Sequence, residues 1–167
     1  MNRAAQARGC LERALAHNEE RFGAESPEVV RNLVNLGRAL DELDANSKAM
    51  TCFERALAIV LASDGPESER AATIHYRMGK SLQKQGLLPE ALAQLQKALR
   101  IDDKVFGKSH AAVARDAYAI GCVLADLNDP VVAMGHFTLA LDIYETTLGK
   151  NDPRARKVRS KLDALSQ

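Results

Sequence analysis

Side chains that could bind an anionic ligand recur along one face of three predicted helices. At 100° per residue, four positions per helix lie opposite the apolar face, and six of these twelve positions are basic whereas two are acidic. Lys and Arg side chains donate charge-assisted hydrogen bonds to carboxylates. The positions are Arg31, Asn35, Arg38, Glu42, Thr73, Arg77, Lys80, Lys84, Arg115, Ala119, Cys122 and Asp126.

Two interpretations of this stripe remain open. The stripe could line a groove that binds an acidic or carboxylate-bearing peptide, in which Asn35 bonds the peptide backbone and Tyr76 and Tyr118 offer flat apolar contact. Alternatively it is an ordinary solvated face, because exposed helix surfaces are usually charged. The predicted groove residues are Arg31, Asn35, Arg38, Tyr76, Arg77, Lys80, Lys84, Arg115 and Tyr118.

Other chemistry finds little support in the sequence. Gly79-Lys80-Ser81 and Gly107-Lys108-Ser109 resemble the end of a phosphate-binding loop, but that loop needs a further Gly where Ile74 and Asp102 stand. No Ser or Cys nucleophile has a recognisable partner motif. We therefore predict a protein that is not an enzyme.

Histidines and cysteines do not suggest a metal or cofactor site. The four histidines show no metal-ligand spacing; His75 is predicted to pack in the core and His110 to cap a helix. Cys10, Cys52 and Cys122 form no CxxC pair, and we expect free thiols. No cofactor and no metal are predicted.

The overall charge and hydropathy limit the class of partner. Lys and Arg number 23 against 22 Asp and Glu, so the formal net charge is +1 and nucleic-acid binding is not favoured. The longest apolar run, 56–62, is too short to span a bilayer, and 1–10 lacks a signal-peptide core. We expect a soluble, cytoplasmic chain that does not bind membranes.

A 42-residue repeat is the strongest signal in the sequence. The words LERAL, FERAL, LQKAL and FTLAL begin at Leu11, Phe53, Leu95 and Phe137. Further series share the period: Gly23, Gly65, Gly107, Gly149; Gly37, Gly79, Gly121; Ala7, Ala49, Ala91, Ala133; and Ala14, Ala56, Ala98, Ala140.

Each unit is predicted to fold as two helices joined by tight turns. In 26–65, Ser26 and Pro27 suit a helix start, the helix should break near Asp44, and a second helix should run over 47–63 to Gly65. The fold is predicted to be all-α, a right-handed α-solenoid of helix-turn-helix repeats in one domain, 1–167. Its parts are a lone second helix at 1–23, full repeats at 26–65, 68–107 and 110–149, and a capping helix at 152–167.

The small residues and the last helix lead to specific packing expectations. The Ala columns and Gly37, Gly79 and Gly121 predict close helix crossings, because Gly inside a helix costs roughly 1 kcal/mol against Ala. The capping helix carries Arg154, Arg156, Lys157, Arg159 and Lys161, which we interpret as a solvated outer face.

These residues resemble the tetratricopeptide repeat, with its Gly in the first helix and its Ala, aromatic or Leu, and Ala in the second. The 42-residue length, FERALAI and the turn after Phe22-Gly23 and Leu148-Gly149 are similar to the kinesin light chain and nephrocystin-like subgroup. The resemblance implies a curved solenoid whose first helices line a concave groove. It also implies that Asn35 and Arg77 stand where carboxylate-gripping members carry such residues.

The predicted function is therefore a non-enzymatic adaptor that binds a peptide of a partner protein in the groove, and the basic stripe makes an acidic peptide the first candidate. Two alternatives remain: a structural spacer that self-associates through Leu11 and Leu15 of the first helix, and a fragment of a larger kinesin-light-chain-like or regulatory protein.

Overall fold

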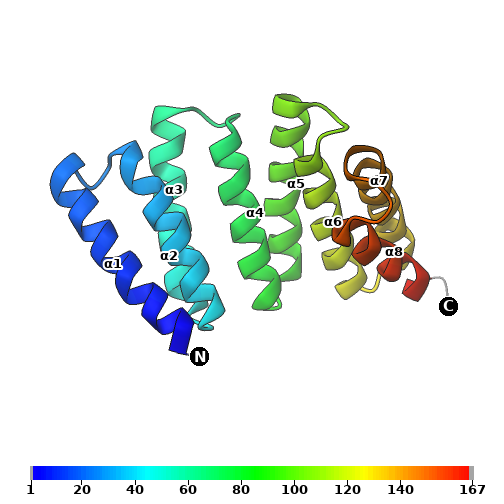
Figure 1. Ribbon diagram of the computed structural model, residues 1–167, viewed down its shortest axis with the longest axis horizontal. Coiled ribbons are helices and arrows are strands. Elements are labelled where there is room, and N and C mark those ends of the chain that lie inside the picture. The colour runs from blue at the N-terminus through cyan, green and yellow to red at the C-terminus, as the bar shows by residue number, and fades with distance from the viewer. Residues whose placement is uncertain (1, 166–167) are drawn as a thin grey trace.

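The computed structural model describes residues 2–165, which fold into eight α-helices and one short 3-10 turn, without a strand. In Figure 1 the helices follow one another along the long axis of the molecule, from α1 at one end to α8 at the other. The elements are α1 (Asn2–Phe22), η1 (Pro27–Val29), α2 (Val30–Glu42), α3 (Asn46–Ser63), α4 (Glu69–Lys84), α5 (Leu88–Phe106), α6 (Ala111–Asp126), α7 (Pro130–Leu148) and α8 (Pro153–Leu165).

The helices form two rows. Helices α2, α4 and α6 make the row in front in Figure 1, and α3, α5 and α7 make the row behind it. We call the outer surface of α2, α4, α6 and α8 the A-helix face, and that of α3, α5 and α7 the B-helix face. This arrangement confirms the predicted all-α solenoid of helix pairs, in which each element packs mainly on its neighbours in the chain.

Residues with positive φ close the turns at the predicted places. Asp44 and Asn128 have φ of 57° and 61°, and Gly86 at the equivalent position has φ of 75°. Asn and Asp tolerate this left-handed conformation better than other residues with a side chain, because they can hydrogen-bond locally. Positive φ angles therefore recur in the backbone every 42 residues.

Small residues make the close crossings that the sequence predicts. A Cβ atom added at Gly37 would lie 2.5 Å from Phe53 Cε1, and one at Gly121 would lie 2.7 Å from Phe137 Cε1. Both phenylalanines are fully buried. The glycine in the first helix of a repeat therefore makes room for the ring of the second helix, which explains why its cost in helix stability is tolerated.

Alanine columns behave differently along the chain. Ala49, Ala56, Ala91, Ala98, Ala133 and Ala140 are fully buried. Ala7 and Ala14, their equivalents in α1, are exposed. Leu11 and Leu15 of α1 are partly buried and pack against the core formed by α2 and α3.

Side-chain caps are present at some helix starts, whereas those of α2, α3 and α5 have none. The Ser68 hydroxyl accepts a hydrogen bond of 3.3 Å from the Ala71 N–H, and the Asp129 carboxylate accepts one of 3.2 Å from the Val132 N–H. The prediction that Ser26 caps a helix is wrong, since its hydroxyl donates to Glu28 and accepts no backbone N–H. The chain instead makes a 3-10 turn there, and α2 begins at Val30.

Candidate peptide-binding surface on the A-helix face

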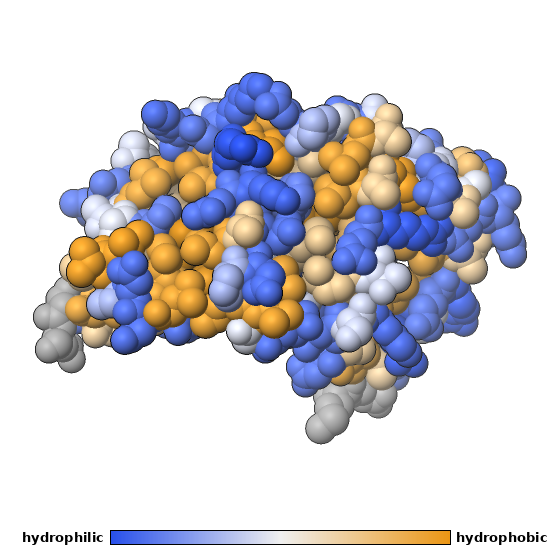
Figure 2. Space-filling view, turned by 180° about the vertical axis from the view of Figure 1, so that it is seen from behind, coloured by the Kyte–Doolittle hydropathy of each residue, from blue (hydrophilic) through white to orange (hydrophobic). Residues whose placement is uncertain are grey.

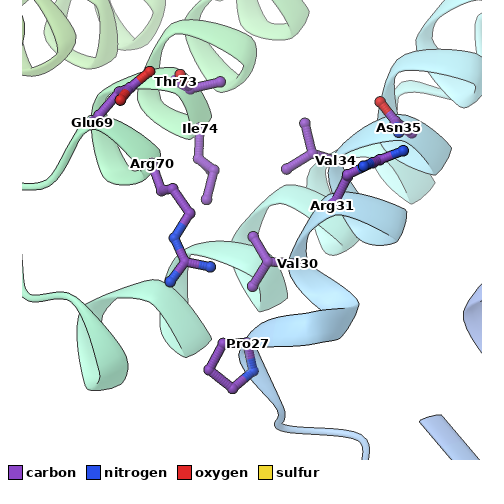
Figure 3. A pocket seen from close by; sticks show the side chains of 9 residues that line it. All are labelled: Pro27, Val30, Arg31, Val34, Asn35, Glu69, Arg70, Thr73 and Ile74. Carbon is purple, nitrogen blue, oxygen red and sulfur yellow. The ribbon is translucent and has the colours of Figure 1, made fainter. Parts of the chain in front are cut away.

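The first predicted groove residues, Arg31 and Asn35, border a cavity of about 300 Å³ between α2 and α4. Figure 3 shows Val30 and Val34 of α2 and Ile74 of α4 facing the gap between the two helices. Arg70 enters from α4, but its guanidinium is paired with Asp64. The floor of this cavity is therefore mainly apolar, and its polar groups lie at the rim.

A second cavity of about 190 Å³ lies further along the same two helices. It brings together four of the predicted basic residues, which we call the central cluster: Arg38, Arg77, Lys80 and Lys84. The ring of Tyr76 borders it, and the Arg77 guanidinium lies over this ring, 5.5 Å from its centroid. The sequence predicted that these residues share a face, and the structure places them around one cavity.

Positive charge in the central cluster is only partly compensated. Asp41 and Glu42 are the acidic residues lining the cavity, and Asp41 Oδ1 already accepts a 2.7 Å hydrogen bond from the Ser81 hydroxyl. Among residues 2–165, no carboxylate lies within ion-pair distance of the four cations. Lys84 Nζ donates instead to the Asp41 carbonyl oxygen, at 2.8 Å.

Arg77 is the most constrained member of this cluster. It is half-buried, and its buried Nε has no hydrogen-bond partner in the described part of the chain. Burial lowers the pKa of Arg77 below its usual range, and the nearby Arg38 guanidinium lowers it further. Both effects mean that the surroundings oppose the positive charge, so an added anion near Arg77 would be stabilised.

A third cavity, of about 210 Å³, lies between α4, α6, α7 and α8. It shares Tyr76 with the central cluster and contains Arg115 and Tyr118, the remaining predicted residues. Tyr144, Arg154, Lys157 and Val158 complete its lining. The Arg115 guanidinium lies 4.3 Å from the Tyr76 ring centroid, and Lys157 Nζ lies 5.3 Å from that of Tyr118.

The sequence predicts that Arg115 is available to a ligand, but in the structure its positive charge is already paired. Its Nη2 lies 2.9 Å from Asp102 Oδ2, and its Nε donates a 2.8 Å hydrogen bond to Asp116 Oδ1. Both carboxylates are buried. One cation thus faces two buried anions, and burial raises the pKa of Asp116 to about 7, with the Asp102 carboxylate adding to the rise.

Sequence reasoning missed this acidic pair although the repeat contains a signal for it. Asp102 stands 42 residues after Val60 and 42 before Tyr144, and Asp116 stands 42 after Ile74. All three equivalents are buried. A carboxylate in a column of core residues indicates a buried ion pair, because an unpaired buried charge is very costly.

The last helix also contributes more than predicted. Arg154 and Lys157 of α8 are exposed, but they lie over the rings of Tyr144 and Tyr118 and border the third cavity. These basic side chains are therefore solvated, as expected, and in addition lie over two aromatic rings. In α6, Ala119 is buried, whereas the sequence predicts it in the exposed stripe.

The histidines sit where the repeat register predicts. His75 is buried and its Nδ1 lies 2.7 Å from Gln94 Oε1, while His110 Nδ1 accepts a 3.2 Å hydrogen bond from the Ala112 N–H at the start of α6.

Cys10, Cys52 and Cys122 are free thiols. The described residues contain no group of three His, Cys, Asp or Glu side chains placed to hold a metal ion. Within residues 2–165, no helix has the length and apolar character needed to cross a membrane.

Comparison with known families agrees with this architecture. The family model for the tetratricopeptide repeat matches residues 1–62 and 70–146. The chain therefore belongs to the tetratricopeptide repeat family, whose members generally mediate protein–protein interactions and are typically scaffolds rather than enzymes. No curated protein sequence gives a significant match.

Several solved structures share the fold. A kinesin light chain-like protein of Podospora anserina with nearly identical repeats has a TM-score of 0.81 at 17% identity, covering 99% of this chain and 79% of its own. BtubC of P. vanneervenii has a TM-score of 0.75 at 17% identity, covering 98% of this chain; our chain spans 63% of its length. The N-terminal domain of stress-induced protein-1 of C. elegans has a TM-score of 0.63 at 16% identity, with 84% and 97% covered. Identities this low establish the fold alone.

Proposed function

We propose that this chain binds an acidic peptide segment of a partner protein on its A-helix face, with the central cluster as the main binding site. The supporting observation is the only partly compensated positive charge around the second cavity, above all the half-buried Arg77 with its unpartnered Nε. A carboxylate of the peptide would accept hydrogen bonds from Arg77 and Lys80. It would also offset their positive charges, which burial and the neighbouring cations disfavour.

The neighbouring cavities supply the remaining contacts. Tyr76 borders both the second and the third cavity, so its ring offers an apolar surface between two polar ends of a peptide. Asn35 lies at the rim of the first cavity and can bond a peptide backbone. The peptide would therefore cross α2, α4 and α6, with Arg31 and Tyr118 near its two ends.

The decisive experiment is a titration of the wild type and an R77E/K80E variant with peptides selected on an array of acidic, basic and neutral sequences. We expect acidic sequences to be selected, and the double reversal to weaken their binding by at least about tenfold, or roughly 1.4 kcal/mol. Unfolding in urea should change little, because neither side chain belongs to the buried core.

A matched control is available on α8. Arg156 is exposed and makes no ion pair with a described residue, whereas Arg159 is paired with Glu145 and would confound a reversal. R156E should keep wild-type affinity. Selection of neutral or basic peptides, or an equal loss in R156E, would show that the stripe is only a solvated face.

A further inference from the structure

The B-helix face of α7 is unusually apolar. Val131, Val132 and Leu139 expose 79%, 46% and 41% of their surface. The space-filling view in Figure 2, taken from behind, shows apolar residues gathered toward the end of the molecule that contains the C-terminal helices. Scattered exposed apolar residues are ordinary, but exposed apolar side chains that gather on one helix indicate an interaction site.

The repeat provides an internal control for this stripe. Val132 occupies the position of Glu90 in α5 and Lys48 in α3, and Leu139 that of Lys97 and Arg55. The fold therefore accommodates charged residues at both positions in the other two units. Only α7 of these three helices replaces them with apolar side chains, so packing within a repeat does not explain the difference.

A groove runs beside the stripe. The cavity between α5 and α7 measures about 610 Å³ and has Leu99, Val113 and Leu139 among its lining. Its rim has a net positive charge, because Arg100 and Lys108 form no ion pair with a described residue and face the single carboxylate of Asp103. The groove thus combines an apolar floor with cations along one side.

Two polar atoms at the groove have no partner. Asp103 Oδ1 and His136 Nδ1 are buried and make no hydrogen bond within the described residues. Both side chains line the groove. Burial lowers the pKa of His136, which favours a neutral ring. A neutral His136 adds no charge to the groove, so the two cations, Arg100 and Lys108, outnumber the single carboxylate of Asp103.

We propose that the stripe on α7 and the adjoining groove dock an amphipathic helix of a partner protein, with carboxylates along its edge that faces α5. Val132 and Leu139 are seven residues apart, or about 10 Å along the helix, which matches apolar anchors at i, i+4 and i+7 of a bound helix. Acidic side chains at the edge would pair with Arg100 and Lys108.

The basic rim favours such a partner over a second copy of the chain. In a two-fold dimer the same surface patch meets itself. Arg100 and Lys108 of one copy would then approach those of the other, and the groove offers only the carboxylate of Asp103 against these two cations. An acidic helix avoids this repulsion and covers the same apolar stripe.

The test uses V132E/L139K, which gives α7 the residues that α5 carries at the same positions and therefore keeps the fold and the net charge. Two labelled peptides of about four helical turns serve as probes. Both have Leu on one face, with Glu on the other face in the first and Lys in the second. Fluorescence anisotropy gives their affinities, and sedimentation equilibrium gives the mass of each protein.

All affinities are measured in the R77E/K80E background, which removes the central cluster as a second site for acidic peptides. We expect the Glu peptide to bind R77E/K80E with a Kd below about 1 mM, the Lys peptide to bind it at least about tenfold more weakly, and the addition of V132E/L139K to lower the affinity for the Glu peptide at least about tenfold. The proposal is overturned if the Glu peptide does not bind R77E/K80E, or if the addition of V132E/L139K leaves its affinity unchanged. It is also overturned if the wild type is a dimer that V132E/L139K separates. None of these results depends on what binds the central cluster.

Discussion

Arg77 and Arg115 lie in successive repeats on one face, at the two sides of Tyr76, but their surroundings are opposite. Arg77 has no carboxylate partner in the described chain, and its Nε is unsatisfied. Arg115 pairs with two buried carboxylates. A row of basic residues therefore does not by itself define an anion-binding surface; the number of carboxylates behind each cation decides whether its charge is available.

The largest expected effect concerns stability at the Arg115 end. Arg115→Ala leaves Asp102 and Asp116 buried without a cation, and breaking a buried pair in this way costs on the order of 3–5 kcal/mol. Arg77→Ala should change stability by about 0.5 kcal/mol or less, because it removes a cation that its surroundings already oppose. Urea melts of the two variants measure both values. Equal losses would contradict the contrast between the two arginines.

The next effect is a pH dependence of stability. The pKa of Asp116 is raised from 3.8 to about 7 in the folded chain, so the native state holds a proton that the unfolded state releases between these values. Stability from this group is therefore full below pH 3.8 and is lost as pH rises through about 7, by roughly 2–4 kcal/mol. Other groups also titrate, so the measured quantity is the difference between wild type and D116N.

D116N removes the titrating carboxylate while Arg115 keeps Asp102 as its partner. The free energy of unfolding of the wild type should therefore fall more steeply between pH 4 and 7 than that of D116N. An identical slope for the two proteins would mean that the Asp102–Asp116 pair does not bind an extra proton in the folded state.

The next effect in size is the salt dependence of peptide binding at the central cluster. If the central cluster binds acidic peptides, affinity should fall by about tenfold or more as ionic strength rises from low salt to 0.15 M and above, because exposed charges are screened over about 8 Å. R77E/K80E should lose both the affinity and most of this salt dependence. An unchanged salt dependence in that variant would place the electrostatic contact elsewhere, for example at Arg154 and Lys157.

The sequence was informative for the fold and for which residues share a face, and much less so for charge. A period of 42 residues fixes the helix pairs, the glycine crossings at Gly37 and Gly121, and the left-handed turns at Asp44 and Asn128, because each depends on local chemistry. The pairing of Arg115 with Asp102 joins two helices, α5 and α6, and depends on how they pack. The position of Arg154 over Tyr144 likewise depends on how α8 docks.

The smallest expected effect tests Tyr76 as the link between the two arginines. Its ring centroid lies 4.3 Å from the Arg115 guanidinium and 5.5 Å from that of Arg77. A cation near an aromatic ring contributes about 0.5–1 kcal/mol at partly exposed sites and more when it is closer and better buried. Tyr76→Leu keeps apolar bulk and removes the ring, so double-mutant cycles with Arg115→Ala and Arg77→Ala isolate each contact. The coupling should be larger for Arg115, because the two buried carboxylates hold its guanidinium against the ring, whereas no carboxylate fixes Arg77. A larger coupling to Arg77 would show that the ring stabilises the free cation instead, and that Arg77 is less available to a ligand than its unpaired Nε indicates.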